Sequence, residues 1–216
     1  LNFDDNAPGL IESLGPVADR INARNGDKLK MDWWYATVLP TNWKLAMEAF
    51  MEGYHVMQTH PQLHWVSPNA NARWGPEADG KVWNVDLPGD KAWDLNVDFM
   101  EKLSAGMAGM VHETELALMQ KWRGEGFEGS DTEATMAFFG RAMHEIRDDA
   151  RARGADMFDI PKVSMEVEMN AVEFMFPHLF FLPMMGAMSG YRCRPLTPET
   201  CYFEIWSLVI RPEGEE

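Results

Sequence analysis

Residues 42–61 read NWKLAMEAFMEGYHVMQTHP and are the most informative segment of this 216-residue chain. On a helical wheel with about 100° per residue, the large apolar side chains of this segment fall on two opposite sides. A helix with two apolar sides is expected to be buried on both. Glu48, Glu52 and His55 form a polar strip between those sides. Because buried ionisable groups need an ionic partner or a metal, the strip predicts a bound partner.

The two histidines of this segment would point apart on a continuous helix. His60 lies five residues after His55, which is about 140° further round an ideal helix. Pro61 changes this geometry, because a residue that precedes proline is driven out of the helical region. We therefore expect the helix to end near Gln58 or Thr59, so that His60 folds back towards His55.

Two imidazoles beside a carboxylate are a known set of iron ligands. Two His and one carboxylate form the facial triad of non-haem Fe(II) oxygenases, which leaves coordination positions open for oxygen and substrate. On the residues alone, two interpretations stay open. His55 and His60 are metal ligands, or they are ordinary core or surface histidines with satisfied hydrogen bonds.

Four short motifs in this segment favour the first interpretation. They are NWK at 42–44, EAF at 48–50, EGYH at 52–55 and THP at 59–61. Together they resemble the iron-binding signature of the Rieske-type aromatic ring-hydroxylating oxygenases, in the catalytic domain of the large (α) subunit. A weaker similarity extends to FPH at 176–178 and EIW at 204–206.

This resemblance implies an enzyme that uses O2 to hydroxylate an aromatic or similarly apolar compound, as in aromatic hydrocarbon catabolism; mono- and dioxygenation both stay open. It implies that His55 and His60 bind a mononuclear Fe(II). It further implies that Glu52, where the family usually has Asp, is the catalytic residue that connects this iron with the Rieske [2Fe–2S] cluster of a neighbouring subunit. Lys44 and Glu48 are expected to support the ligands. Candidates for the substrate pocket, chosen for their nearness in sequence, are Phe50, Val56 and Leu63.

Three features depart from the family pattern. Ala49 stands where the family often has Asn. Cys193 and Cys201 are the only cysteines, and neither has a neighbouring His, whereas a Rieske centre needs two Cys and two His. The family's last iron ligand is an Asp beyond the final strand, and this sequence ends at Glu216. We therefore expect residues 1–216 to be one catalytic iron domain, with the N-terminal Rieske domain and a C-terminal helix outside it.

The implied partners follow from the same resemblance. They are O2, a small aromatic substrate, a ferredoxin or reductase as electron donor, and further copies of the chain in a homotrimer, with or without a β subunit.

The amino-acid composition limits the partners and the location independently. The formal charge of −15 argues against nucleic acid as a partner, and the sequence has neither a signal-like start nor a long apolar run, which predicts a cytoplasmic protein without a membrane span.

Periodicity and turn residues predict an α+β protein. The expected helices cover residues 10–25 with a break at Pro16, 42–58 after a cap at Thr41 or Asn42, 98–123, and a segment capped by Ser130 or Asp131 with Glu133 in a capping box. The expected strands cover residues 28–39, 80–87, 163–176, 178–194 and 201–210. His112 and His144 are expected on helix surfaces, and residues 61–79 form a loop beside the metal. The resemblance implies a helix-grip (START-like) domain, in which a curved antiparallel sheet wraps over a helix and encloses the ligand.

A second hypothesis belongs to a different class of protein. The chain could be a non-catalytic helix-grip module that binds or carries a ligand, with structural histidines. The presence of Glu52, His55 and His60 together argues for the oxygenase. Iron and acid-labile sulfide analysis of the whole protein separates the two hypotheses, because a carrier contains neither.

Overall fold

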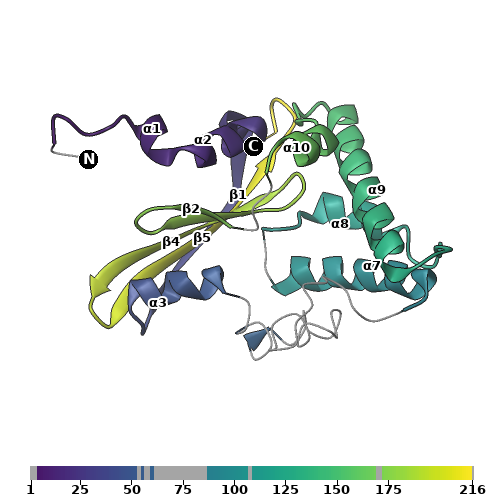
Figure 1. The fold of residues 1–216 in the computed structure, drawn as a ribbon, viewed down its shortest axis with the longest axis horizontal. Coiled ribbons are helices and arrows are strands. Elements are labelled where there is room, and N and C mark those ends of the chain that lie inside the picture. Colours follow the sequence, from purple (N-terminus) through teal and green to yellow (C-terminus); the bar gives the residue numbers. More distant parts are fainter. Residues whose placement is uncertain are drawn as a thin grey trace.

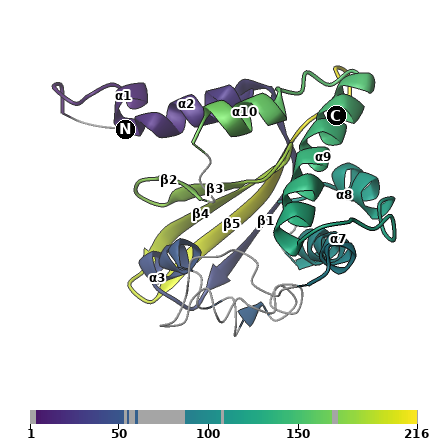
Figure 2. The same ribbon diagram turned by 45° about the vertical axis from the view of Figure 1, so that its right-hand side comes forward.

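The computed structural model describes residues 4–52, 55, 59–60, 87–106, 109–168 and 172–215. Within these residues, an antiparallel sheet of five strands has the order β1-β5-β4-β3-β2. The strands are β1 (Leu29–Leu39), β2 (Glu173–Met175), β3 (Leu179–Pro183), β4 (Met188–Thr197) and β5 (Thr200–Ile210). The first strand of the chain thus pairs with the last one, and Figures 1 and 2 show the sheet twisting between groups of helices.

Helices surround this sheet on several sides (Figures 1 and 2). The α-helices are α1 (Leu10–Leu14), α2 (Pro16–Ala23), α3 (Trp43–Glu48), α7 (Gly89–Gly106), α8 (Glu113–Gln120), α9 (Asp131–Ala152) and α10 (Ile160–Glu166). Two short 3-10 helices, Gly26–Lys28 and Ala49–Met51, lie beside α2 and α3 in the sequence. The predicted α+β class and the helix-grip arrangement of a curved antiparallel sheet with helices are confirmed. No helix in the described ranges combines the length and apolarity needed to cross a membrane.

Two apolar clusters divide the interior. The larger one lies among α7, α8, α9 and α10 and includes Trp93, Trp122 and Phe138. The smaller one lies on the sheet, where Phe180 and Tyr191 are buried under residues of α3. The second cluster matters for the predicted site, because it holds the segment that leads into the two histidines.

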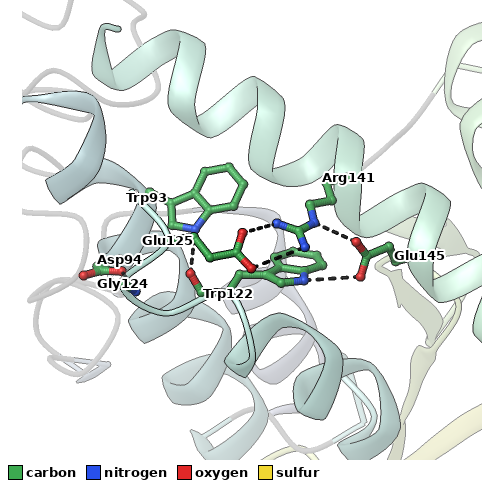
Figure 3. Close-up of polar contacts among 7 residues, drawn as sticks. All are labelled: Trp93, Asp94, Trp122, Gly124, Glu125, Arg141 and Glu145. Carbon is green, nitrogen blue, oxygen red and sulfur yellow. Dashed lines mark hydrogen bonds and ion pairs between the residues drawn. The ribbon is translucent and has the colours of Figure 1, made fainter. Parts of the chain in front are cut away.

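A polar network joins α7, α9 and the loop after α8 (Figure 3). The Trp93 indole N–H donates to the Trp122 carbonyl oxygen at 3.0 Å, and the Trp122 indole N–H donates to Glu145 at 3.2 Å. Arg141 lies 4.4 Å from the Trp122 ring centroid and donates to both Glu145 and Glu125. This network fixes how the three helical segments pack together.

Several local predictions are confirmed. Pro16 occupies the first turn of α2, directly after α1 ends. Asn42 caps α3, because its side chain accepts a hydrogen bond from the Lys44 N–H at 2.9 Å. Ser130 and Glu133 form the expected capping box at the start of α9. Each of these signals acts over four residues or fewer, which is why the sequence alone revealed them.

The two cysteines are not joined by a disulfide bond. Cys193 and Cys201 are buried free cysteines on the paired strands β4 and β5. Burial, and to a smaller extent the nearby Cys201, raises the pKa of the Cys193 thiol to about 12. Both cysteines therefore act as small core side chains in this structure.

Other predicted elements were wrong. The helix expected at 98–123 is interrupted, since Gly109 has a φ of +98° and α8 begins afresh at Glu113. His112 is therefore the N-cap of α8 and not a helix-surface residue. The helix expected up to residue 58 ends much earlier: α3 stops at Glu48, a 3-10 turn follows, and Glu52 is extended, with φ −132° and ψ 161°.

The strands expected at 163–176 and 178–194 were also too long. Residues 160–166 form α10 instead, because Pro161 stands in its first turn and Asp159 caps it. The strand after it, β2, covers only Glu173–Met175. The segment 178–194 is a hairpin, in which the Met184 N–H donates to the Ala187 carbonyl oxygen at 3.1 Å and β3 turns into β4. The loop expected at 61–79 lies outside the described residues, as does the strand expected at 80–87 except for its last residue, Leu87.

Candidate metal centre

The path towards the two histidines starts from an aromatic anchor on the sheet. The Phe50 ring lies 4.6 Å from the Phe180 ring and 4.8 Å from the Tyr191 ring, measured between centroids. Trp43 and Met47 of α3 pack against the same cluster. Because Phe50 is only two residues before Glu52, this anchor holds the backbone from which the polar site begins.

Glu52 makes a two-point contact with His55. One carboxylate oxygen lies 2.6 Å from the Nδ1 atom of the His55 ring, and the other accepts the His55 backbone N–H at 3.1 Å. Both side chains are partly buried. Since an ionised carboxylate only accepts hydrogen bonds, Nδ1 of His55 carries the proton, and Nε2 is the nitrogen with a lone pair. The sequence placed Glu52 and His55 on one helix face, whereas Glu52 is extended in the structure and reaches His55 through these two contacts.

His60 lies close to His55, and hydrogen bonds tie the residue before it to His55. The backbone N–H and the hydroxyl of Thr59 both donate to the His55 carbonyl oxygen, each at 2.8 Å. The His55 and His60 rings consequently lie 5.4 Å apart between centroids, at an angle of 74°. The predicted approach of the two imidazoles is confirmed, although α3, which ends at Glu48, does not extend to them.

The electrostatics of His60 favour the neutral ring. Burial lowers its pKa below the ordinary value, and the neighbouring His55 lowers it further. A neutral imidazole binds a metal without first losing a proton. The lowered pKa of His60 therefore favours the form of the ring that can bind a metal.

These residues fit a mononuclear iron. A histidine that binds a metal nearly always donates its other ring N–H to a carboxylate, a carbonyl or water, and Glu52 provides such a carboxylate to His55 at 2.6 Å. In the described ranges, no group of three or more His, Cys, Asp or Glu side chains is arranged to hold a metal ion. The described part of the chain thus brings two imidazoles together and provides a carboxylate that contacts one of them.

The other predicted residues have different surroundings. Phe50 lies inside the aromatic cluster on the sheet. Val56 and Leu63 lie outside the described residues. Lys44 and Glu48 are exposed, and the Lys44 ammonium lies 5.7 Å from the centroid of the Trp43 ring.

Sequence reasoning assigned no role to the surroundings of His178. Its ring lies edge-on to Trp43 at 6.4 Å, and its Nδ1 atom is buried without a hydrogen-bond partner in the part of the chain that is described. Burial lowers its pKa, as do Arg192 and Arg194. The cis peptide bond before Pro177 precedes it. His178 follows the Phe-Pro pair directly, and β3 begins at the next residue, Leu179.

The EIW motif at 204–206 begins with a buried glutamate that binds two arginines. Arg192 donates to both oxygens of the buried Glu204 carboxylate, at 2.6 and 2.7 Å, and Arg194 donates at 2.9 Å. These bonds lower the pKa of Glu204. Glu204 therefore anchors two arginines of β4 to β5.

Comparison with known proteins agrees with this geometry. Residues 23–216 match the protein family described as ring hydroxylating alpha subunit (catalytic domain). The match covers most of the chain, so the chain belongs to this family of oxygenases, as the motifs in residues 42–61 predicted.

One similar protein is the carnitine monooxygenase oxygenase subunit of Acinetobacter baumannii. It is 35% identical to this chain over 63 residues, which cover 28% of this chain and 17% of that protein. The chain therefore matches less than a fifth of the length of this relative.

Proposed function

We propose that residues 1–216 form the catalytic iron domain of a Rieske non-haem iron oxygenase, in which His55 and His60 bind a mononuclear Fe(II). The observation that carries this proposal is the joint geometry of three side chains. The Glu52 carboxylate lies 2.6 Å from His55 Nδ1, and the His60 ring lies 5.4 Å from the His55 ring. Membership of the ring-hydroxylating α-subunit family supports the same assignment.

Each residue of this set has a distinct task. When bound, the iron supplies the activation of O2. Glu52 holds the His55 ring in one orientation and keeps the proton on Nδ1, which leaves Nε2 for the metal. Burial keeps His60 neutral. Glu52 also provides a negative charge between this site and the Rieske cluster that delivers electrons from a part of the protein outside this chain.

The proposed reaction is hydroxylation of an aromatic or similarly apolar substrate. Phe50, Val56 and Leu63 remain the proposed contributors to the substrate pocket. The A. baumannii relative is named as a carnitine monooxygenase, so a substrate screen should contain a quaternary ammonium compound beside aromatic ones.

The proposed assembly is a homotrimer, with or without a β subunit, supplied by a ferredoxin or reductase. In such an assembly the cluster of one subunit reaches the iron of the next. We place the protein in the cytoplasm, whose reducing conditions suit the two free thiols of Cys193 and Cys201.

Metal analysis of the whole protein tests the proposal. His55→Ala and His60→Ala should each lose bound iron with little loss of fold, because both histidines lie beyond the aromatic anchor of Phe50. His144→Ala is the matched control, since His144 is exposed on α9 and contacts Arg147. Iron at normal occupancy in either of the first two variants would contradict the assignment. A protein with neither iron nor acid-labile sulfide would support the non-catalytic carrier instead.

A further inference from the structure

The sheet has two faces, and α3, α8 and α9 lie on one of them. Phe180 and Tyr191 of this inner face pack against α3, and Trp33 and Ser207 line a cavity beside α8 and α9. Because side chains alternate along each strand, the residues between these four point to the opposite side. We call this side the outer face. Its members on β1, β4 and β5 are Trp34, Val38, Arg192, Arg194, Tyr202, Glu204 and Trp206.

Aromatic side chains form a row across the outer face. Trp34 of β1 pairs with Trp206 of β5, and Trp206 pairs with Gly190 of β4. A Cβ atom at Gly190 would lie 2.2 Å from Nε1 of Trp206, so the glycine allows the indole ring to lie directly against the β4 backbone. The Trp206 ring reaches to 6.3 Å from the Phe181 ring of β3, measured between centroids. Trp34 is 46% exposed, so the row opens to the surface at β1.

Two arginines lie beside this row and share one carboxylate. Arg192 donates to both oxygens of Glu204, and Arg194 donates to one of them. The Glu204 side chain is only 3% exposed, whereas those of Arg192 and Arg194 are 40% and 47% exposed. Arg194 also lies 5.0 Å from the centroid of the Tyr202 ring. Both guanidinium groups are thus held in place at the surface, and the single carboxylate balances only one of them.

The ratio of charges is the reverse of that on the helical side of the molecule. There, each of three arginines binds two carboxylates; they are Arg123, Arg141 and Arg147. The whole chain has a formal charge of −15. The outer face is therefore an aromatic and locally positive surface on an acidic protein, and an acidic surface complements it.

We propose that the outer face binds an acidic surface of a second copy of this chain. Tryptophan, tyrosine and arginine are the residues most enriched at the centre of protein–protein contacts, and the outer face contains all three. The second copy is the occupant because the chain is itself strongly acidic. This inference rests on the proposed function, in which electrons pass from one copy to the next. In the contact, Trp34 and Trp206 become buried, and Arg192 and Arg194 donate to carboxylates of the second copy.

The two surfaces that meet are different ones. Two outer faces against each other would bring the guanidinium groups of both copies together without enough carboxylates to balance them. The contact is therefore heterologous, and heterologous contacts close into rings, in agreement with the proposed homotrimer. At physiological ionic strength charges act over about 8 Å, so the local charges of the two surfaces decide the contact, although both copies are acidic.

Sedimentation of the whole protein tests the proposal. Trp34→Glu places a negative charge on the outer face, and it should raise the dissociation constant between copies at least about thirtyfold, as the loss of a central contact residue does. The matched control is Tyr35→Glu. Tyr35 is the next residue of β1, is 66% exposed and pairs with Ile205 on the inner face, so its variant should associate like the natural chain.

A second position separates charge from shape. Val38 is 54% exposed and pairs with Tyr202 on the outer face. Val38→Glu and Val38→Lys both introduce a long charged side chain. Against an acidic surface, Val38→Glu should weaken the contact at least about tenfold more than Val38→Lys does. Equal effects of the two variants would overturn the charge complementarity.

Mixing the natural chain with a variant tests whether the contact is heterologous. Trp34→Glu keeps the acidic surface, so an excess of this variant should bind the natural chain and prevent ring closure. Fluorescently labelled natural chain should then sediment as a smaller species. Under a symmetric contact between two outer faces, the variant could not bind, and an unchanged natural assembly would contradict the heterologous arrangement.

The proposal fails if the whole protein is monomeric, or if Trp34→Glu, shown to be folded by thermal unfolding, associates like the natural chain. Iron and acid-labile sulfide are measured in the same samples. A protein that contains both, and whose association does not respond to Trp34→Glu, overturns the interface and leaves the iron assignment in place. A protein that contains neither overturns the oxygenase proposal, whatever its state of association.

Discussion

Replacing Glu115 by Gln should change the pH dependence of stability. Glu115 is buried at the start of α8, and both of its oxygens accept backbone N–H groups. Its pKa rises from 4.5 to about 7, chiefly because burial disfavours the charged carboxylate. Gln keeps the shape of the side chain but never ionises. The variant therefore removes the ionisation and leaves the packing in place.

The size of the effect follows from the pKa shift. Between pH 4.5 and pH 7 the folded protein binds more protons at Glu115 than the unfolded chain does, so the free energy of unfolding falls as the pH rises through this window. A shift of this size corresponds to about 3 kcal/mol at about 1.4 kcal/mol per pH unit. The favourable contribution is complete below pH 4.5 and is lost above pH 7.

The substitution also removes a hydrogen bond, which lowers the free energy of unfolding. The Gln amide accepts only one of the two backbone N–H groups, since its NH2 group is a donor, and the lost hydrogen bond costs about 1 kcal/mol. Glu115→Gln should therefore be about as stable as the natural chain at pH 5 and more stable by about 2 kcal/mol at pH 8. The difference in free energy of unfolding should grow steadily between these two pH values.

Urea unfolding at pH 5, 6, 7 and 8 measures this difference. Glu113→Gln is the matched control, because Glu113 lies on the same turn of α8 but is exposed, and its difference from the natural chain should stay nearly constant. A Glu115→Gln difference that is equally constant across these pH values would refute the reasoning.

Three further predictions concern the site, the helices and the assembly. Glu52→Gln should retain iron but slow turnover, because the amide still accepts from the His55 ring while the negative charge is lost; loss of iron, measured by metal analysis, would instead make Glu52 a direct ligand. Arg141→Met should lower the free energy of unfolding by about 1–2 kcal/mol, since it removes the contact with the Trp122 ring and two ion pairs, whereas Arg153→Met, with one exposed ion pair, should cost about 0.5 kcal/mol or less in urea unfolding. The whole protein should be a trimer in light scattering, and a monomer would contradict electron delivery from a neighbouring subunit.

Local signals in the sequence determined a large part of this structure. The caps at Asn42 and Ser130, the break at Pro16 and the hairpin between Cys193 and Cys201 each depend on neighbouring residues, and all four are present. The motifs in residues 42–61 also identified the family. Such features are readable because their free energy arises within a few residues.

The bounds of the longer helices and strands depend on tertiary contacts that the sequence does not show. The alternation at 163–176 is compatible with a strand, but Asp159 and Pro161 start a helix there, and Ile160 and Val163 are buried against the helical core. The helix expected at 98–123 is interrupted at Gly109. This residue has a left-handed conformation and packs closely against Ser207 and Trp33 of the sheet.

The site divides in the same way. The sequence by itself shows that Glu52, His55 and His60 are close in the chain, in a pattern that predicts a metal site. Only the tertiary structure decided how they meet. Phe50 is held by Phe180 and Tyr191 from distant strands, α3 ends early, and hydrogen bonds join His55 to Glu52 and to Thr59.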